Sequence, residues 1–176
     1  MSIATLRAAL PPYARDLELN LDAVLAGDLL DEQRLWGAAL ACAMTTRSAM
    51  VLRNVAAEAA DHLKPEAVEA AKAVASRMAI HNVYFRAKHL IGDEAYQHLP
   101  ARLRRQVAST PGVGAADIEA WSVAVSAITG CGVCLESHER SLRGAGVSRE
   151  VVDEVLRVAA VVHALAVTLD AEAALD

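Results

Sequence analysis

The stretch Gly130-Cys-Gly-Val-Cys-Leu-Glu-Ser-His138 is the part of the sequence around which the rest of the chain is organised. Its first glycine ends a long apolar run, and from Cys131 onward the spacing of apolar residues fits a new helix. With about 100° of rotation per residue, Cys131, Cys134 and His138 fall within roughly 60° of one another on that helix. The two sulfur atoms can therefore close a short disulfide, and the imidazole lies one turn beyond the second sulfur.

The position of these cysteines predicts reactive sulfur. Unpaired amide groups and the helix dipole stabilise a thiolate at a helix N-terminus. A free cysteine has a pKa of about 8.5, and the pKa falls well below that in Cys-x-x-Cys sites at helix N-termini. The imidazole of His138 can accept the thiol proton. This combination is typical of a dithiol oxidoreductase.

The composition predicts one domain built from closely packed helices. The 176 residues are 55% apolar but only 3% aromatic, and alanine, the best helix former, supplies much of the apolar share. The 17 basic and 22 acidic residues give a net charge of −5. Because no basic stripe accompanies this negative charge, we expect no nucleic-acid partner.

The distribution of apolar residues also predicts a cytoplasmic protein that does not enter a membrane. Residues 1–10 contain Arg7 and lack the long apolar core of a signal peptide. The uncharged run at residues 120–135 is short for a bilayer and holds two glycines, and charged residues interrupt the apolar segment 151–169. In a cytoplasmic chain, a close pair among three cysteines favours a catalytic or metal-binding role over a structural disulfide.

Capping residues, prolines and glycines divide the chain into helices. No segment alternates apolar and polar residues with a period of two, so we predict an all-α fold. We expect a connector at residues 92–100 and a turn at residues 111–114. The expected helices are residues 2–10, 13–25, one capped by Asp31, one capped by Ser48, 65 to about 89, a short basic helix at 101–109 (with Arg102, Arg104 and Arg105), 115–129, the cysteine helix, and a last helix from a Ser148 cap to about 175.

The two halves of the chain resemble each other at an offset of 85 residues. Trp36 and Trp121 are 121 − 36 = 85 positions apart, and each lies early in an apolar helical segment. We therefore predict a single all-helical domain over residues 1–176 that contains two degenerate repeats, at about 20–90 and 105–176. At this offset Thr46, Ala49 and Arg53 correspond to the two cysteines and the histidine, so the first half would keep the scaffold without the chemistry.

One more residue completes a recognisable pattern. Glu119 precedes Cys131 by twelve residues, and Glu-x11-Cys-x2-Cys-x3-His resembles the signature of the AhpD-type alkylhydroperoxidases of the carboxymuconolactone decarboxylase-like superfamily. The resemblance covers essentially the whole chain. It includes the segments 8–20, Leu35-Trp36-Gly37, 58–62 and Trp121-Ser-Val-Ala-Val-Ser-Ala-Ile.

The resemblance implies an antioxidant peroxidase with an all-helical, two-repeat fold that assembles as a homotrimer. Such an enzyme reduces organic hydroperoxides and the disulfide of a partner peroxiredoxin. Its electrons come from dihydrolipoamide, which is carried on a lipoylated acyltransferase and regenerated by dihydrolipoamide dehydrogenase. No tightly bound cofactor and no metal is implied.

The resemblance also assigns roles to four side chains. Cys134 would be oxidised to a sulfenic acid, and Cys131 would be the proton donor and resolving thiol that closes the redox disulfide. His138 and Glu119 would form the proton relay. Val133 departs from the family pattern, because many members have a histidine immediately before the second cysteine, and this change bears on activity and on the route of the proton.

Other interpretations of these residues are less favoured. The motif with Glu119 offers four potential zinc ligands, but a structural zinc site usually draws two ligands from a separate element, and no second cysteine pair exists. Haem attachment requires histidine where Leu135 stands. An inert cysteine pair, a general dithiol–disulfide oxidoreductase and a non-redox decarboxylase-like enzyme remain as alternatives.

The remaining cysteine and histidines have no pattern of their own. We expect Cys42 to fill the core. We expect the histidines outside the motif to be packed or solvated rather than ligands, with His81 and His89 as candidates for a subunit interface. They are His62, His81, His89, His98 and His163.

Overall fold

The computed structural model describes residues 2–104 and 110–175, and this part of the chain contains helices and no β-strand. The predicted all-α fold is confirmed. The helices are α1 (Ile3–Ala8), the 3-10 helix η1 (Pro12–Ala14), α2 (Arg15–Ala26), α3 (Glu32–Thr46), α4 (Ala49–His62), α5 (Pro65–Ile91), α6 (Glu94–His98), α7 (Ala115–Thr129), α8 (Gly132–Gly144) and α9 (Arg149–Leu175).

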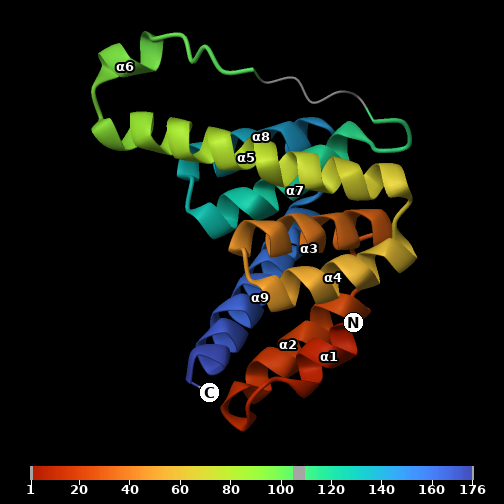
Figure 1. Ribbon diagram of the computed structural model, residues 1–176. Coiled ribbons are helices and arrows are strands. Elements are labelled where there is room, and N and C mark those ends of the chain that lie inside the picture. Colours follow the sequence, from red (N-terminus) through yellow and green to blue (C-terminus); the bar gives the residue numbers. More distant parts are fainter. Residues whose placement is uncertain (1, 105–109, 176) are drawn as a thin grey trace.

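Two helices form the centre of the molecule. α3 packs against α4, α5, α7 and α9, and α7 packs against α3, α5, α8 and α9. Both helices are rich in alanine, so their backbones approach closely. The segment from Leu35 to Ala43 is buried throughout. In Figure 1, α1 and α2 lie at one end of the molecule, and α5 and α8 lie at the other.

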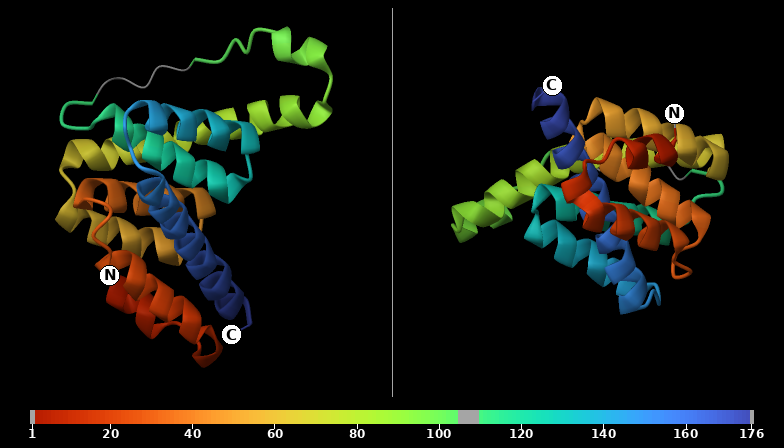
Figure 2. Two further views of the ribbon diagram at one scale, coloured as in Figure 1. Left: turned by 180° about the vertical axis from the view of Figure 1, so that it is seen from behind. Right: turned by 90° about the horizontal axis from the view of Figure 1, so that it is seen from below.

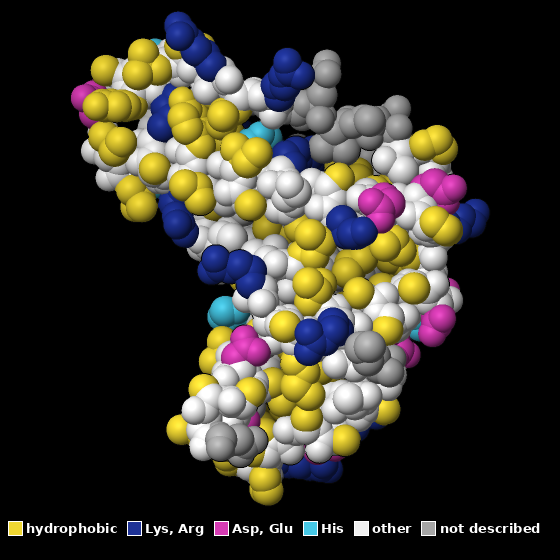
Figure 3. All heavy atoms as spheres, viewed as in Figure 1, with side chains coloured by type: hydrophobic (Ala, Val, Ile, Leu, Met, Phe, Trp, Pro, Cys, Tyr) yellow, Lys and Arg dark blue, Asp and Glu magenta, His cyan; other side chains and the backbone are white. Residues whose placement is uncertain are grey.

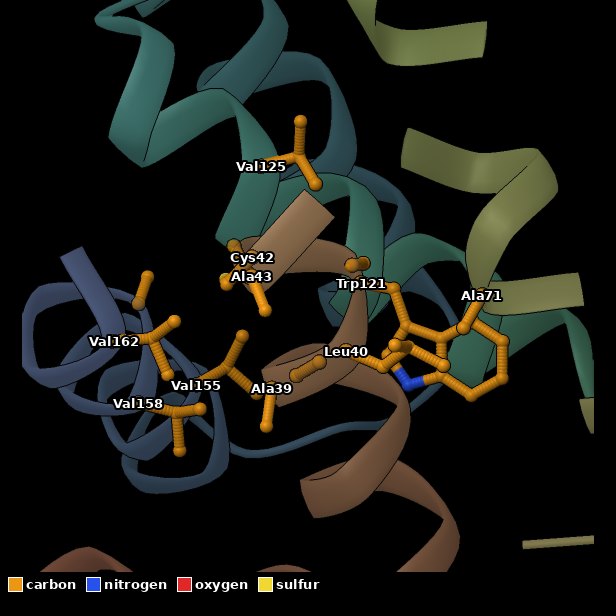
Figure 4. Packing of buried hydrophobic residues seen from close by; sticks show 14 of the residues in the cluster. Ala39, Leu40, Cys42, Ala43, Ala71, Trp121, Val125, Val155, Val158 and Val162 are labelled. Atoms are coloured by element: carbon orange, nitrogen blue, oxygen red, sulfur yellow. The ribbon is translucent and has the colours of Figure 1, made fainter. Parts of the chain in front are cut away.

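A tryptophan and a glycine fix how α3 and α7 cross. Trp121 is fully buried, and its indole Nε1 donates to the carbonyl of Arg34 at 3.2 Å. A Cβ atom at Gly37 would lie 2.1 Å from Cε2 of this indole, so only glycine fits there. In Figure 4 the Trp121 side chain lies in the core with Leu40 and Ala71.

The long C-terminal helix closes the core. α9 is the helix, among those described, whose length and composition would also suit a membrane span. Here its apolar face lies inside the molecule: Val155, Val158 and Leu165 are buried, and the helix packs against α2, α3, α4 and α7. Figure 2 shows the same helix from two further sides.

The two halves share an order of helices. α3 and α7 have 15 residues each and α5 and α9 have 27 each. The first pair starts 115 − 32 = 83 residues apart and the second pair 149 − 65 = 84. Arg47 and Gly130 end α3 and α7 with φ of 62° and 66°. These spacings differ from the offset of 85 that pairs the two tryptophans, so the repeat and its register stay a prediction.

The region between α5 and α7 differs most from expectation. The predicted connector at residues 92–100 contains the short helix α6, which the Asp93 side chain caps through the Ala95 amide. The predicted basic helix at 101–109 is wrong for residues 101–104, which are not helical, and Arg102 has a positive φ of 52°. Residues 105–109 lie outside the described part of the chain.

Candidate active site

The two motif cysteines lie at the junction of α7 and α8. Gly130 adopts a left-handed conformation that ends α7, and the amide of Cys131 then donates to the carbonyl of Ser126 at 3.1 Å. Cys131 is the N-cap residue of α8, and Cys134 lies in its first turn. The sequence pattern thus predicted the helix start correctly, and both sulfur atoms lie at the end of a helix dipole that favours negative charge.

The two sulfur atoms are bonded to each other, and their Cα atoms are 5.3 Å apart. They are not equally accessible. Cys131 is fully buried, whereas Cys134 is 5% exposed and lines a cavity. A molecule that enters the cavity therefore meets the sulfur of Cys134 first, with Cys131 behind it.

The histidine of the motif lies one turn further along α8 and pairs with α7. Its Nδ1 is 2.7 Å from Oε2 of Glu119, and the two side chains are 19% and 29% exposed. An ionised Glu119 accepts a hydrogen bond from the Nδ1–H of His138, which leaves Nε2 as the proton-accepting nitrogen. Partial burial strengthens this pairing relative to an exposed ion pair.

A cavity of about 400 Å³ joins these groups. It is open to one side and is lined by both apolar and polar groups. Its walls come from α5, α6, α7 and α8: Arg77, His81, Phe85, His89, Gln97, Glu119, Val133, Cys134, Ser137 and His138. Three of the four site residues predicted from the sequence thus lie in the wall of one cavity, and the fourth is bonded to one of them.

The α5 wall of the cavity was missed from the sequence. Arg77, His81, Phe85 and His89 follow one another at intervals of four residues, which places them on one face of a helix. We expected His81 and His89 to be packed, solvated or at a subunit interface. The regular spacing of basic and aromatic side chains was the signal that could have identified this wall.

Arg77 brings a guanidinium group to the cavity wall. Its Nη2 donates to Oγ of Ser122 on α7 at 3.1 Å. Burial lowers the pKa of Arg77, and the neighbouring Glu119 carboxylate opposes that shift. The guanidinium therefore lies in the electrostatic field of the same carboxylate that pairs with His138.

The remaining candidates have structural surroundings. Cys42 is fully buried, and burial raises the pKa of its thiol, so its predicted place in the core is confirmed. His62 stacks on Trp36 with 4.6 Å between ring centroids, and its Nδ1 is 3.1 Å from Glu32. Within residues 2–104 and 110–175, no three His, Cys, Asp or Glu side chains are grouped to hold a metal ion.

Comparisons with known proteins agree on one family. Residues 94–176 match the model of the carboxymuconolactone decarboxylase family. The alkyl hydroperoxide reductase AhpD of Streptomyces coelicolor is 52% identical over 175 residues, which is 99% of this chain and 98% of that protein. The protein of the same name from Frankia alni is 52% identical over 171 residues, covering 97% and 92% of the two chains. The one from Rhodospirillum centenum is 49% identical over 176 residues, covering 100% and 95%.

Proposed function

The chain belongs to the AhpD-type alkyl hydroperoxide reductases of the carboxymuconolactone decarboxylase family, and on that premise we propose that it reduces organic hydroperoxides through the Cys131–Cys134 pair. The observation that carries this proposal is the 2.7 Å contact between His138 and Glu119 in the cavity that Cys134 lines. A nucleophilic sulfur, a base and a group that orients the base are thereby brought together.

The first step needs a thiolate. In the reduced enzyme, Nε2 of His138 accepts the proton of the Cys134 thiol, and the Glu119 carboxylate stabilises the imidazolium. The thiolate attacks one oxygen of the hydroperoxide, so an S–O bond forms while the O–O bond breaks. The leaving alkoxide takes the proton of the Cys131 thiol and departs as an alcohol, which leaves Cys134 as a sulfenic acid and Cys131 as a thiolate.

The second step uses the buried sulfur. The Cys131 thiolate attacks the sulfur of the Cys134 sulfenic acid, a disulfide forms, and the leaving hydroxide takes the proton from His138 to become water. In the disulfide the two Cα atoms are 5.3 Å apart, a separation that is usual for such a bond.

A reduced dithiol then resets the site, and we propose dihydrolipoamide as that donor. One of its thiolates attacks the Cys134 sulfur, because this is the sulfur that lines the cavity, and Cys131 leaves as the thiolate. The second lipoyl thiol attacks the mixed disulfide, which releases oxidised lipoamide and the Cys131–Cys134 dithiol. A lipoylated acyltransferase and dihydrolipoamide dehydrogenase would supply these electrons, and the disulfide of a partner peroxiredoxin would accept them by the same exchange.

Val133 has no group that could take part in proton transfer. It occupies the position where many family members have a second histidine, and it lines the cavity as an apolar side chain. The proton path of this protein therefore rests on His138 and Glu119 together.

We further propose that the enzyme is a homotrimer. Apolar side chains are exposed over the C-terminal end of α5 and over α6, where Figure 3 shows a gathering of yellow atoms. They are Val83, Leu90, Ile91, Tyr96 and Leu99. Contiguous exposed apolar surface of this kind marks association sites. Sedimentation velocity of the wild type checks the proposed assembly, and a monomer at micromolar concentration would contradict it.

The central experiment couples peroxide reduction to NADH oxidation through lipoamide and dihydrolipoamide dehydrogenase. We expect Cys134→Ser and Cys131→Ser each to abolish turnover, whereas Cys42→Ala, which removes the cysteine outside the site, retains it. Full steady-state activity in either serine variant would refute the proposal.

The same assay separates the alternatives. A general dithiol–disulfide oxidoreductase would oxidise dihydrolipoamide with a protein disulfide but show no dependence on peroxide. A non-redox decarboxylase-like enzyme would neither lose two thiols on treatment with peroxide nor regain them with dihydrolipoamide. Loss and recovery of two thiols together with peroxide-dependent turnover is the result that we expect.

A further inference from the structure

Arg77 occupies a place in the site that the proposed mechanism does not use. It extends from α5 into the cavity that Glu119, Cys134 and His138 line from the opposite helices. Its Nη2 is anchored on Ser122, which is itself fully buried and donates to the carbonyl of Ile118 at 2.7 Å. This bond holds the guanidinium against α7. Glu119 lies on the same helix, about one turn before Ser122.

The hydrogen bond to Ser122 does not satisfy the whole guanidinium of Arg77. In the part of the chain that the structure describes, the buried Nε of this side chain has no hydrogen-bond partner. A buried N–H of a charged group is costly when it is unpaired. An attraction to a nearby carboxylate would offset this cost, and Glu119 is the carboxylate that lines the same cavity.

We propose that Arg77 is a positioning residue of this site, whose anchored guanidinium favours negative charge in the cavity and thereby sets the pH at which Cys134 becomes a thiolate. A cation close to a thiol favours its thiolate form, and Arg77 lines the same cavity as Cys134. The inference rests on the proposed function in that Cys134 is the reacting thiol.

Other charged groups lie on the helices around the cluster. α5 also contributes His81 and His89 to the cavity wall, and α6 contributes the uncharged Gln97. Arg86 of α5 donates to the carbonyl of Thr129 at the end of α7. On the side of α7 that faces α3, Asp117 is paired with Arg34 at 2.9 Å. On α9, Glu154 is paired with Arg157 at 2.6 Å. On α8, Glu136 is paired with Arg140 at the surface, and Glu139 is half-buried.

The test measures thiol reactivity without peroxide. The fully reduced protein is alkylated with iodoacetamide across a range of pH, and mass spectrometry identifies the labelled cysteine. We expect Arg77→Met to move the midpoint of the rate of Cys134 alkylation to higher pH by about one unit, the size of effect of one charge at close range. Arg77→Lys, which keeps the charge, should restore most of the shift. Lys72→Met, which removes an exposed cation from the same helix, should leave the midpoint unchanged.

A second variant covers the case in which Arg77→Met fails to fold. Ser122→Ala retains the cation but removes its anchor, and it should produce a smaller shift in the same direction. An unchanged midpoint in a folded Arg77→Met or, failing that, in Ser122→Ala would overturn the inference. So would equal shifts in the methionine and lysine variants, which would indicate a purely structural role.

The result is separable from the proposed function. If wild-type turnover of peroxide is present but the alkylation midpoint does not respond to Arg77, the inference fails and the function stands. If the wild type shows no peroxide turnover but the midpoint shifts as described, the proposed function fails while Arg77 still tunes the sulfur.

Discussion

The Glu119 carboxylate lies 2.7 Å from Nδ1 of His138. We expect Glu119→Gln to lower kcat/KM for an organic hydroperoxide by about 100-fold, because an amide does not hold the imidazolium and general acid–base assistance is worth about that much. Stopped-flow oxidation of the reduced enzyme measures the effect.

Glu136→Gln is the matched control for this substitution. Glu136 lies on α8 in an exposed ion pair with Arg140, outside the cavity wall. Its substitution should leave kcat/KM unchanged, and a similar loss in both variants would argue against a specific role for Glu119.

The contact between Gly37 and Trp121 predicts a strong response to one methyl group. We expect Gly37→Ala to lower the free energy of unfolding by about 3 kcal/mol, because the added Cβ would overlap a fully buried indole and overpacking costs about this much. Urea denaturation measures it. Gly144→Ala on α8, where nothing lies within 4 Å of the new Cβ, is the control and should be neutral or slightly stabilising. Equal stability of the two variants would contradict the packing argument.

Individual residues were predictable where their role is local. The capping side chains of Asp31 and Ser48 were found from the sequence, because a cap depends on the next three residues only. Glu119 was found through the family resemblance, since nothing local separates it from a solvated carboxylate. Arg77 was missed because its neighbours lie on α7, 45 residues away in the case of Ser122.

At the scale of helices, two N-terminal serine caps differ in burial, so their contributions to stability can be compared. Ser48 is buried, accepts from the amide of Val51 and donates to Asp170 at 2.6 Å, which ties α4 to the end of α9. Ser148 accepts from the amide of Val151 at an exposed site. We expect Ser48→Ala to lower the free energy of unfolding by about 2 kcal/mol and Ser148→Ala by about 0.5 to 1.

Thermal and urea denaturation of both variants measure this difference. The buried serine also leaves the Asp170 carboxylate without its donor when it is removed, so its loss should be the greater one. An equal loss in the two variants would show that the link between α4 and α9 contributes nothing beyond the cap.

The ends of a helix were predictable where proline and glycine residues flank it. α7 begins and ends at the predicted residues, because a Pro-Gly turn precedes it and Gly130 follows it. α6 was missed because its five residues are too few to show a helical period, and its position depends on contacts with α5. The basic segment at 101–104 was read as a helix from composition alone, and the chain there is extended or irregular instead.

At the scale of the whole molecule, one lysine joins α6 to the main body. Lys88 is nearly buried, and its Nζ donates to the carbonyl of Leu99 at 2.9 Å while Gln97 donates back to the carbonyl of Lys88. Gln97 also lines the cavity. We expect Lys88→Met to speed amide hydrogen exchange in α6 by about tenfold or more, since a hydrogen bond to a charged group is worth at least that factor.

The control is again an exposed lysine of the same helix. Lys72→Met should leave exchange in α6 unchanged, and exchange in α3 should be the same in both variants. If α6 keeps its protection without Lys88, the lysine does not hold this segment in place.

The arrangement of the helices around the site could not be predicted from the sequence. That the chain is all-helical follows from its composition and periodicity, and the family resemblance brought the four motif residues together. The cavity, however, depends on the register at which α5 lies across α7 and α8, and long-range packing fixes that register. The contribution of α5 to the cavity wall could therefore not be predicted from the sequence.

Because Cys42 is buried, the reactivity of its thiol reports whether the chain is folded. A thiol-specific dye should react with Cys134 in the native, reduced enzyme and with no cysteine after a stoichiometric dose of hydroperoxide. Cys42 should become reactive only when α3 is exposed by unfolding, because this thiol is buried in the core and its raised pKa keeps it protonated. A single titration thus reports both the oxidation state of the enzyme and the fraction of chains that remain folded.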